Sequence, residues 1–233
     1  MQRHVGALSI FLLLLTGPGW ASDASYISLN QVNLGNLLAP PPAPQSDEQK
    51  LDLMAVLQAQ KDRTTSQSER AVADNDLSVF RIAGSVLGPN FTPALVPKSA
   101  AFFDRIWKDY RRIILATKDV WDRPRPFNVS IDVKPIGKLE HSGSYPSGHA
   151  TRGYLSAIIL SNMVLEKKES LFARAREYGQ SRVIAGDHFP SDVQAGRLAA
   201  TAIAVAFMQN EAFMKDFAEA KAELRRELGL SLQ

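Results

Sequence analysis

The sequence predicts an all-α fold, a single-domain helical bundle. Apolar residues recur at helical spacing along most of the chain after residue 97, and no stretch alternates polar and apolar side chains for long. The only candidate strand, residues 128–133, is short and isolated. With 233 residues, of which 45% are hydrophobic and 22% charged, the chain is large enough to bury one sizeable core.

The first 21 residues have the pattern of a secretory signal peptide. Arg3 precedes an apolar run from Leu8 to Leu15, and small residues follow a Gly-Pro-Gly break. The run is shorter than the roughly 20 residues that a membrane-spanning helix needs, so a membrane anchor is the less favoured alternative. We expect cleavage after Ala21, or alternatively after Ala24, and a periplasmic or secreted protein that has no membrane contact once the signal is removed.

Charge and cysteine content argue against two classes of site. Removal of Arg3 lowers the formal charge from +3 to +2, and the remaining basic residues are dispersed, so a nucleic-acid polymer is not an expected partner. The chain has no cysteine, which excludes both disulfide bonds and a thiolate metal site. The fold must therefore rest on packing alone.

A proline-rich arm at residues 22–46 precedes the main helical domain, residues 47–233. Three consecutive prolines, Pro40 to Pro42, cannot be helical and favour an extended segment laid over the surface. Ser46 is a good N-cap for the first helix of the domain. An apolar stripe is expected on that helix at Leu51, Met54, Val56 and Leu57.

Five further helices account for the rest of the apolar periodicity. Prolines begin two of them, at Pro97 and Pro190, and Pro124 ends the helix that Pro97 begins. The expected helices are residues 97–121, 147–165, 171–184, 190–208 and 212–228.

A helix N-terminus suited to an anion is expected at Ser147-Gly148-His149. Ser147 is a good N-cap, and the first turn that follows presents free backbone N–H groups with positive dipole character. Gly148 would let an anion approach the backbone closely, with His149 at the rim. The alternative interpretation is that Ser147 only caps a helix and His149 is a surface residue.

A second helix start combines a histidine with a carboxylate. Pro190 suits the first helical position, which leaves His188 just before the helix and Asp192 in its first turn. A carboxylate that accepts one imidazole N–H fixes the tautomer and leaves the other ring nitrogen as a nucleophile. Arg182, six residues before His188, could reach the same pocket. Alternatively, Asp192 only complements the helix dipole and Arg182 is solvated.

Lys118 and Arg125 add two cations to this set. They are seven residues apart, close to two helical turns, although Pro124 bends the chain between them. Arg125 lies between two prolines on a stiff segment, and its guanidinium matches two phosphate oxygens at once. The alternative is a solvated pair, since Asp119 and Asp122 are close in sequence.

The three motifs together resemble the signature of the phosphatidic acid phosphatase type 2 superfamily. They are Lys118 to Arg125-Pro126, then Pro146-Ser147-Gly148-His149, then Ser181-Arg182 to His188 and Asp192. Within the superfamily the chain is similar to the class A bacterial non-specific acid phosphatases. That likeness is carried by residues 38–42, 143–149, 179–184 and 191–193 and covers nearly the whole mature chain. It implies a helical bundle of the acid phosphatase and vanadium haloperoxidase type.

The resemblance also implies roles for these residues. His188 would attack phosphorus to form a phosphohistidine, Asp192 would orient it, and His149 would protonate the leaving alkoxide and then act as base for water. The phosphoryl oxygens would be held by Lys118, Arg125, Ser147, Gly148 and Arg182. The expected substrates are small phosphate monoesters, hydrolysed in mild acid, and neither a metal ion nor another cofactor is implied. Similar proteins are often homodimers or larger, so a homo-oligomer is also expected.

Three positions depart from the family pattern or stand apart from it. Ala150 replaces a threonine that often follows the Pro-Ser-Gly-His run, and Phe189-Pro190 replaces a common Trp-Gln pair. Asp187 is unusual beside His188; it could raise the basicity of the imidazole, but we expect its side chain to point to water. His141 is expected in a solvent-side loop.

Two other functions remain as alternatives to a phosphomonoesterase. A vanadium-dependent haloperoxidase would use the same residues, because vanadate resembles the phosphoryl transition state, although the chain length and the class A features argue against it. A non-catalytic phosphate-binding protein would need the cations and helix ends, but not two histidines and Asp192.

Overall fold

The computed structural model describes residues 25–232, and within them the all-α prediction is confirmed: no strand is present. The predicted signal peptide, with its cleavage site, lies outside the described residues. The helices are α1 (Leu34–Leu37), α2 (Asp47–Asp62), α3 (Thr65–Ala73), α4 (Val79–Leu87), α5 (Pro97–Trp121), α6 (Pro126–Val129), α7 (Gly148–Met163), α8 (Lys168–Ile184), α9 (Pro190–Met208) and α10 (Glu211–Glu227), with a short 3-10 helix, Leu165–Lys167, before α8.

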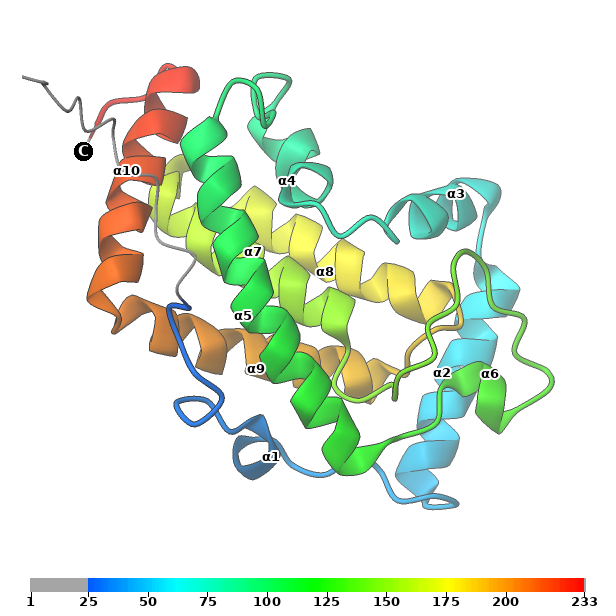
Figure 1. Ribbon diagram of the computed structural model, residues 1–233. Coiled ribbons are helices and arrows are strands. Elements are labelled where there is room, and N and C mark those ends of the chain that lie inside the picture. Colours follow the sequence, from blue (N-terminus) through cyan, green and yellow to red (C-terminus); the bar gives the residue numbers. More distant parts are fainter. Residues whose placement is uncertain (1–24, 233) are drawn as a thin grey trace, which may run out of the picture.

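Helix α7 is the centre of the bundle and packs against both α8 and α9, while α5 packs against α10 (Figure 1). The core residues of α7 lie on most of its faces, as expected for a helix surrounded by others. Aromatic rings fill the region between α5, α9 and α10, where Phe207 and Phe213 stack with ring centroids 5.1 Å apart. α2 and α6 lie at the end of the bundle where α8 ends and α9 begins.

The starts of α7 and α9 are held side by side by a close backbone approach. The backbone N–H of Ser147 donates to the carbonyl of Asp192 at 3.0 Å. A Cβ atom on Gly196 would lie 2.7 Å from the carbonyl oxygen of Ser147 and 3.1 Å from the backbone nitrogen of Thr151, so only glycine fits there. This contact brings the two helix N-termini that carry His149 and Asp192 into one region.

Residues 25–46 lie against the helices. The backbone amides of Tyr26 and Ile27 both donate to a carboxylate oxygen of Asp109 on α5, at 2.7 and 3.1 Å. Farther along, the Tyr145 hydroxyl donates to the carbonyl of Ala39 at 2.6 Å. The segment is therefore tied to the bundle at two points, and it includes the single helical turn of α1.

The candidate strand at residues 128–133 is absent: Pro126 begins the short helix α6, and the amide of Ser130 donates to the carbonyl of Pro126 at its end. The expected helix with an apolar stripe is α2, but the stripe is only partly buried, because Leu51 and Met54 are 64% and 63% exposed while Val56 is fully buried. α2 packs at the edge of the bundle through a small separate core cluster around Val56, to which Leu51 and Met54 do not belong.

None of the helices in residues 25–232 is both long and apolar enough to cross a membrane.

Candidate active site

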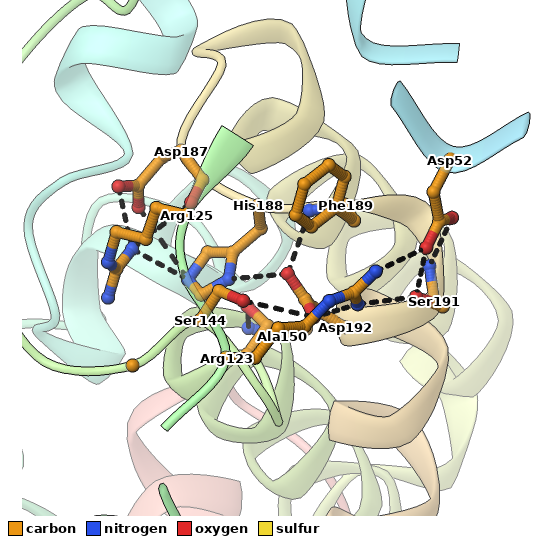
Figure 2. A network of polar contacts seen from close by, with 12 residues as sticks. Asp52, Arg123, Arg125, Ser144, Ala150, Asp187, His188, Phe189, Ser191 and Asp192 are labelled. Carbon is orange, nitrogen blue, oxygen red and sulfur yellow. Dashed lines mark hydrogen bonds and ion pairs between the residues drawn. The ribbon is translucent and has the colours of Figure 1, made fainter. Parts of the chain in front are cut away.

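His188 and Asp192 form a buried pair at the start of α9. A carboxylate oxygen of Asp192, Oδ2, accepts the backbone N–H of Phe189 at 2.8 Å and lies 3.3 Å from Nδ1 of His188 (Figure 2). The spacing of four residues across the helix start therefore places the two side chains together. With Nδ1 donating to Asp192, the lone pair of the imidazole is on Nε2.

Arg123 holds the other side of Asp192. Its guanidinium donates to Oδ1 of Asp192 at 2.6 Å and to Oδ2 of Asp52 at 2.8 Å. It also donates to Ser191 at 2.7 Å and lies over the Phe189 ring, 4.2 Å from the centroid. The carboxylate beside His188 is thus itself paired with a buried cation, as Figure 2 shows.

Arg125 and Asp187 lie on the opposite side of the imidazole (Figure 2). Arg125 donates through Nε to the carbonyl of Ser142 at 2.9 Å and through one terminal nitrogen to Oδ1 of Asp187 at 2.7 Å. That same nitrogen is 3.3 Å from Nε2 of His188. The expectation that Asp187 points to water was wrong: its side chain is buried, because Arg125 pairs with it.

The N-terminus of α7 has the predicted cap. The Ser147 hydroxyl accepts the backbone N–H of Ala150 at 3.3 Å, and the carbonyl of Gly148 accepts the Tyr110 hydroxyl at 2.5 Å. His149 follows in the first turn, is buried, and has Nε2 3.4 Å from the carbonyl of Asn75. The interpretation of His149 as a surface residue was therefore wrong.

Lys118 and Arg182 are buried cations rather than solvated ones. Lys118, near the end of α5, donates to the carbonyl of Gly143. Arg182, near the end of α8, donates to the side chain of Asn75 and to the carbonyl of Ala71, and its Nε has no hydrogen-bond partner. Both side chains are held in place by neutral acceptors, which lie on α3 and on the loops around the site.

A pocket of about 360 Å³ opens above these residues. Five of the eight predicted site residues line it: Lys118, Arg125, Gly148, His149 and His188. The other three, Ser147, Arg182 and Asp192, are buried and do not line it. The rest of the wall has an apolar part, from Leu77 and Ile114 among others, and a charged part that includes Arg111, Lys138 and Glu140.

Burial in the pocket favours the neutral forms of its bases. Burial lowers the pKa of His188 well below 6.5, with Arg125 and Lys118 adding to the effect and Asp187 opposing it. Burial also lowers the pKa of His149, and Arg182 acts in the same direction. Burial and the charge of Arg125 lower the pKa of Lys118 to about 7. The negative charge of an anion in the pocket would offset the repulsion among the cations, so anion binding favours the protonated forms of His188, His149 and Lys118.

Three donor groups could in principle hold a cation. Ring nitrogens of His149 and His188 and a carboxylate oxygen of Asp187 lie within 4.8 Å of one another. Arg125, however, already pairs with Asp187, and Lys118 and Arg182 contribute further positive charge. The electrostatics of the pocket are better suited to an anion than to a metal ion.

Sequence reasoning missed Arg123 and Asn75, and it did not predict that Asp187 is buried against Arg125. Arg123 precedes Arg125 in an Arg-Pro-Arg-Pro run, and the alternation was a signal that both side chains are held on one stiff segment. Asn75 lies in the turn after α3 and contacts both His149 and Arg182. Nothing local to Asn75 indicates that it reaches α7 and α8.

Comparisons with known proteins agree with this geometry. Residues 111–213 match the PAP2 superfamily. The chain is 32% identical over 172 residues to a non-specific acid phosphatase of Providencia stuartii, an alignment that covers 70% of this chain and 69% of the relative. It is 32% identical over 198 residues to an acid phosphatase of Zymomonas mobilis, and this alignment covers 81% of this chain and 74% of the relative. It is 30% identical over 208 residues to a non-specific acid phosphatase of Salmonella typhimurium, and that alignment covers 83% of this chain and 80% of the relative.

A solved structure shows the same fold. It is a transmembrane PAP2-type phosphatidylglycerolphosphate phosphatase from Bacillus subtilis, which aligns with a TM-score of 0.51 and 21% identity over 76% of this chain and 90% of that one. The family match and the curated relatives confirm the resemblance inferred from the three motifs. The chain belongs to the PAP2 superfamily, and its relatives there include bacterial non-specific acid phosphatases.

Proposed function

We propose that the protein is a periplasmic or secreted acid phosphatase that hydrolyses small phosphate monoesters through a phosphohistidine on His188, without a metal ion. The observation that carries the proposal is the His188–Asp192 pair beside a pocket lined by cations. A pocket built only to bind phosphate has no need of an oriented imidazole. The names of the curated relatives support the same class of reaction.

In the first step, Nε2 of His188 attacks phosphorus while the bond from phosphorus to the leaving oxygen breaks. Asp192 keeps the proton on Nδ1 and stabilises the positive charge that the imidazole acquires. His149 gives a proton to the leaving oxygen, so the products are an alcohol and phosphorylated His188. Arg125 lies 3.3 Å from Nε2 of His188, so its guanidinium must move away from that nitrogen for phosphorus to approach.

In the second step, water attacks the phosphorus of phosphohistidine and gives a proton to His149, now the base. The bond from phosphorus to Nε2 breaks, inorganic phosphate leaves, and His188 returns to its neutral form. His149 has regained the proton that it gave up in the first step, so the cycle balances.

The positive groups supply the electrostatic stabilisation that phosphoryl transfer needs. Charge spreads over the phosphoryl oxygens in the transition state, and Lys118, Arg125 and Arg182 would share it with the N-terminus of α7. Burial lowers the pKa of His149, so this imidazole becomes a proton donor when the charge of a bound phosphate favours the imidazolium. A mildly acidic optimum follows, since the acid form of His149 is needed for the first step.

The test is release of phosphate from an aryl phosphate at mildly acid pH, with a chelator present. We expect full wild-type activity with the chelator, none with His188→Ala, and near wild-type activity with His141→Ala, a matched control in the exposed part of the loop. His149→Ala should slow alkyl phosphates far more than aryl phosphates, because an aryl oxide leaves without a proton. Activity in His188→Ala, or its loss on chelation, would overturn the proposal, and phosphate binding without turnover would favour a binding protein.

A further inference from the structure

Asp187 is a second buried carboxylate beside His188, and the proposed phosphoryl transfer gives it no role. Its side chain is about as buried as that of Arg125, with which it pairs through Oδ1 at 2.7 Å. Its other oxygen, Oδ2, has no hydrogen-bond partner and lies 3.6 Å from Nε2 of His188. A buried carboxylate oxygen that accepts no hydrogen bond costs free energy of folding, so its presence points to a ligand that donates a hydrogen bond to it.

The position of Asp187 places this acceptor where a phosphoryl group would lie. A carboxylate oxygen of Asp187 and ring nitrogens of His149 and His188 all lie within 4.8 Å of one another. If His188 attacks phosphorus and His149 faces the leaving oxygen, as proposed above, the phosphoryl group occupies the space between the two rings. Asp187 then borders that space on the same side as Arg125.

Hydrogen-bond chemistry restricts which phosphoryl group fits beside Oδ2. An ionised carboxylate only accepts hydrogen bonds, and the oxygens of a phosphate dianion also only accept, so the two repel. A singly protonated phosphoryl group carries one P–OH, which can donate to the carboxylate. The negative charge of Asp187 also offsets one of the cations around the pocket, which lowers the preference for a dianion.

We propose that Asp187 makes the site selective for the singly protonated phosphate monoanion, whose P–OH group donates a hydrogen bond to Oδ2. The location of the anion rests on the proposed function. In a competing explanation, Asp187 only anchors Arg125. Loss of an anchor would weaken the binding of phosphate and sulfate together, whereas loss of a hydrogen-bond acceptor weakens only the binding of an anion that has a proton to give.

Inorganic phosphate and sulfate separate the two explanations. They have the same shape and similar size, but at about pH 5 inorganic phosphate is a monoanion that carries P–OH groups, whereas sulfate is a dianion that carries no proton. Binding of each anion is measured by calorimetry at that pH on the wild type and on Asp187→Asn. The matched control is Asp216→Asn, which removes another carboxylate paired with an arginine, 2.7 Å from Arg105, on the distant helix α10.

We expect the wild type to bind phosphate at least about tenfold more tightly than sulfate, the scale of a hydrogen bond to a charged group. In Asp187→Asn the amide can donate to sulfate, so the ratio should fall by about tenfold or more, whereas Asp216→Asn keeps the wild-type ratio. Equal wild-type affinities, or an equal loss of both anions in Asp187→Asn, would overturn the inference. Binding is measured without turnover, so failure of the proposed reaction would appear separately, in the aryl phosphate assay.

Discussion

Replacing Gly196 with alanine should destabilise the protein, because α9 approaches the start of α7 too closely for a side chain. The new Cβ would lie 2.7 Å from the carbonyl oxygen of Ser147 and 3.1 Å from the nitrogen of Thr151, and neither backbone atom can move without shifting α7. Overpacking costs about 1–3 kcal/mol, and the better helix propensity of alanine returns up to about 1 kcal/mol. We expect a net loss of roughly 1–2 kcal/mol in the free energy of unfolding.

The matched control is Gly84→Ala on α4, where a Cβ would meet no heavy atom within 4 Å. Only helix propensity changes there, so the protein should gain up to about 1 kcal/mol. Urea unfolding followed by circular dichroism measures both variants, and Gly196→Ala should also lower kcat/KM because Ser147 and His149 shift. A Gly196→Ala protein as stable and active as the wild type would refute the claim that this contact sets the position of the two helix starts.

Two further predictions concern the buried cations. Arg123→Met should lower the free energy of unfolding by about 3–5 kcal/mol, because Asp52 and Asp192 lose their buried partner. The control Arg70→Met removes an exposed ion pair and should lower it by at most about 1 kcal/mol. Equal losses of the two variants in urea unfolding would contradict this prediction. Burial lowers the pKa of Lys118 to about 7, so inhibition by sulfate should weaken as the pH rises through that value and Lys118 loses its charge. Lys118→Arg stays charged and should show a flatter dependence between about pH 6 and 8, whereas parallel profiles would rule out the titration of Lys118 as the cause.

The features that the sequence predicted well depend on neighbours along the chain. Pro97 and Pro190 begin helices because a proline suits the first helical position, and both helices start where expected. Ser147 caps α7 for a similarly local reason. The pairing of His188 with Asp192 follows from a spacing of four residues across a helix start. Each of these predictions needed only geometry within one turn.

The features that the sequence did not reveal depend on contacts between distant segments. Arg123 and Arg125 are two residues apart, yet Arg123 pairs with Asp192 and Arg125 with Asp187, on opposite sides of the imidazole. The order Arg-Pro-Arg-Pro does not predict on which side of the imidazole each arginine side chain lies. Asp187 was expected to face water because an isolated acid usually does, and only the fold brings Arg125 to it.

If His188 is the nucleophile, the enzyme carries a phosphoryl group on that residue during turnover, and this phosphoenzyme can be trapped. The enzyme is mixed with an aryl phosphate, quenched within one turnover in alkali, where a phosphohistidine persists, and digested for mass spectrometry. We expect one phosphoryl group on His188, which is lost on acid treatment and is absent from His188→Ala. A phosphoryl group on His149 or on any other residue, or turnover with no phosphoenzyme in the pre-steady state, would contradict it.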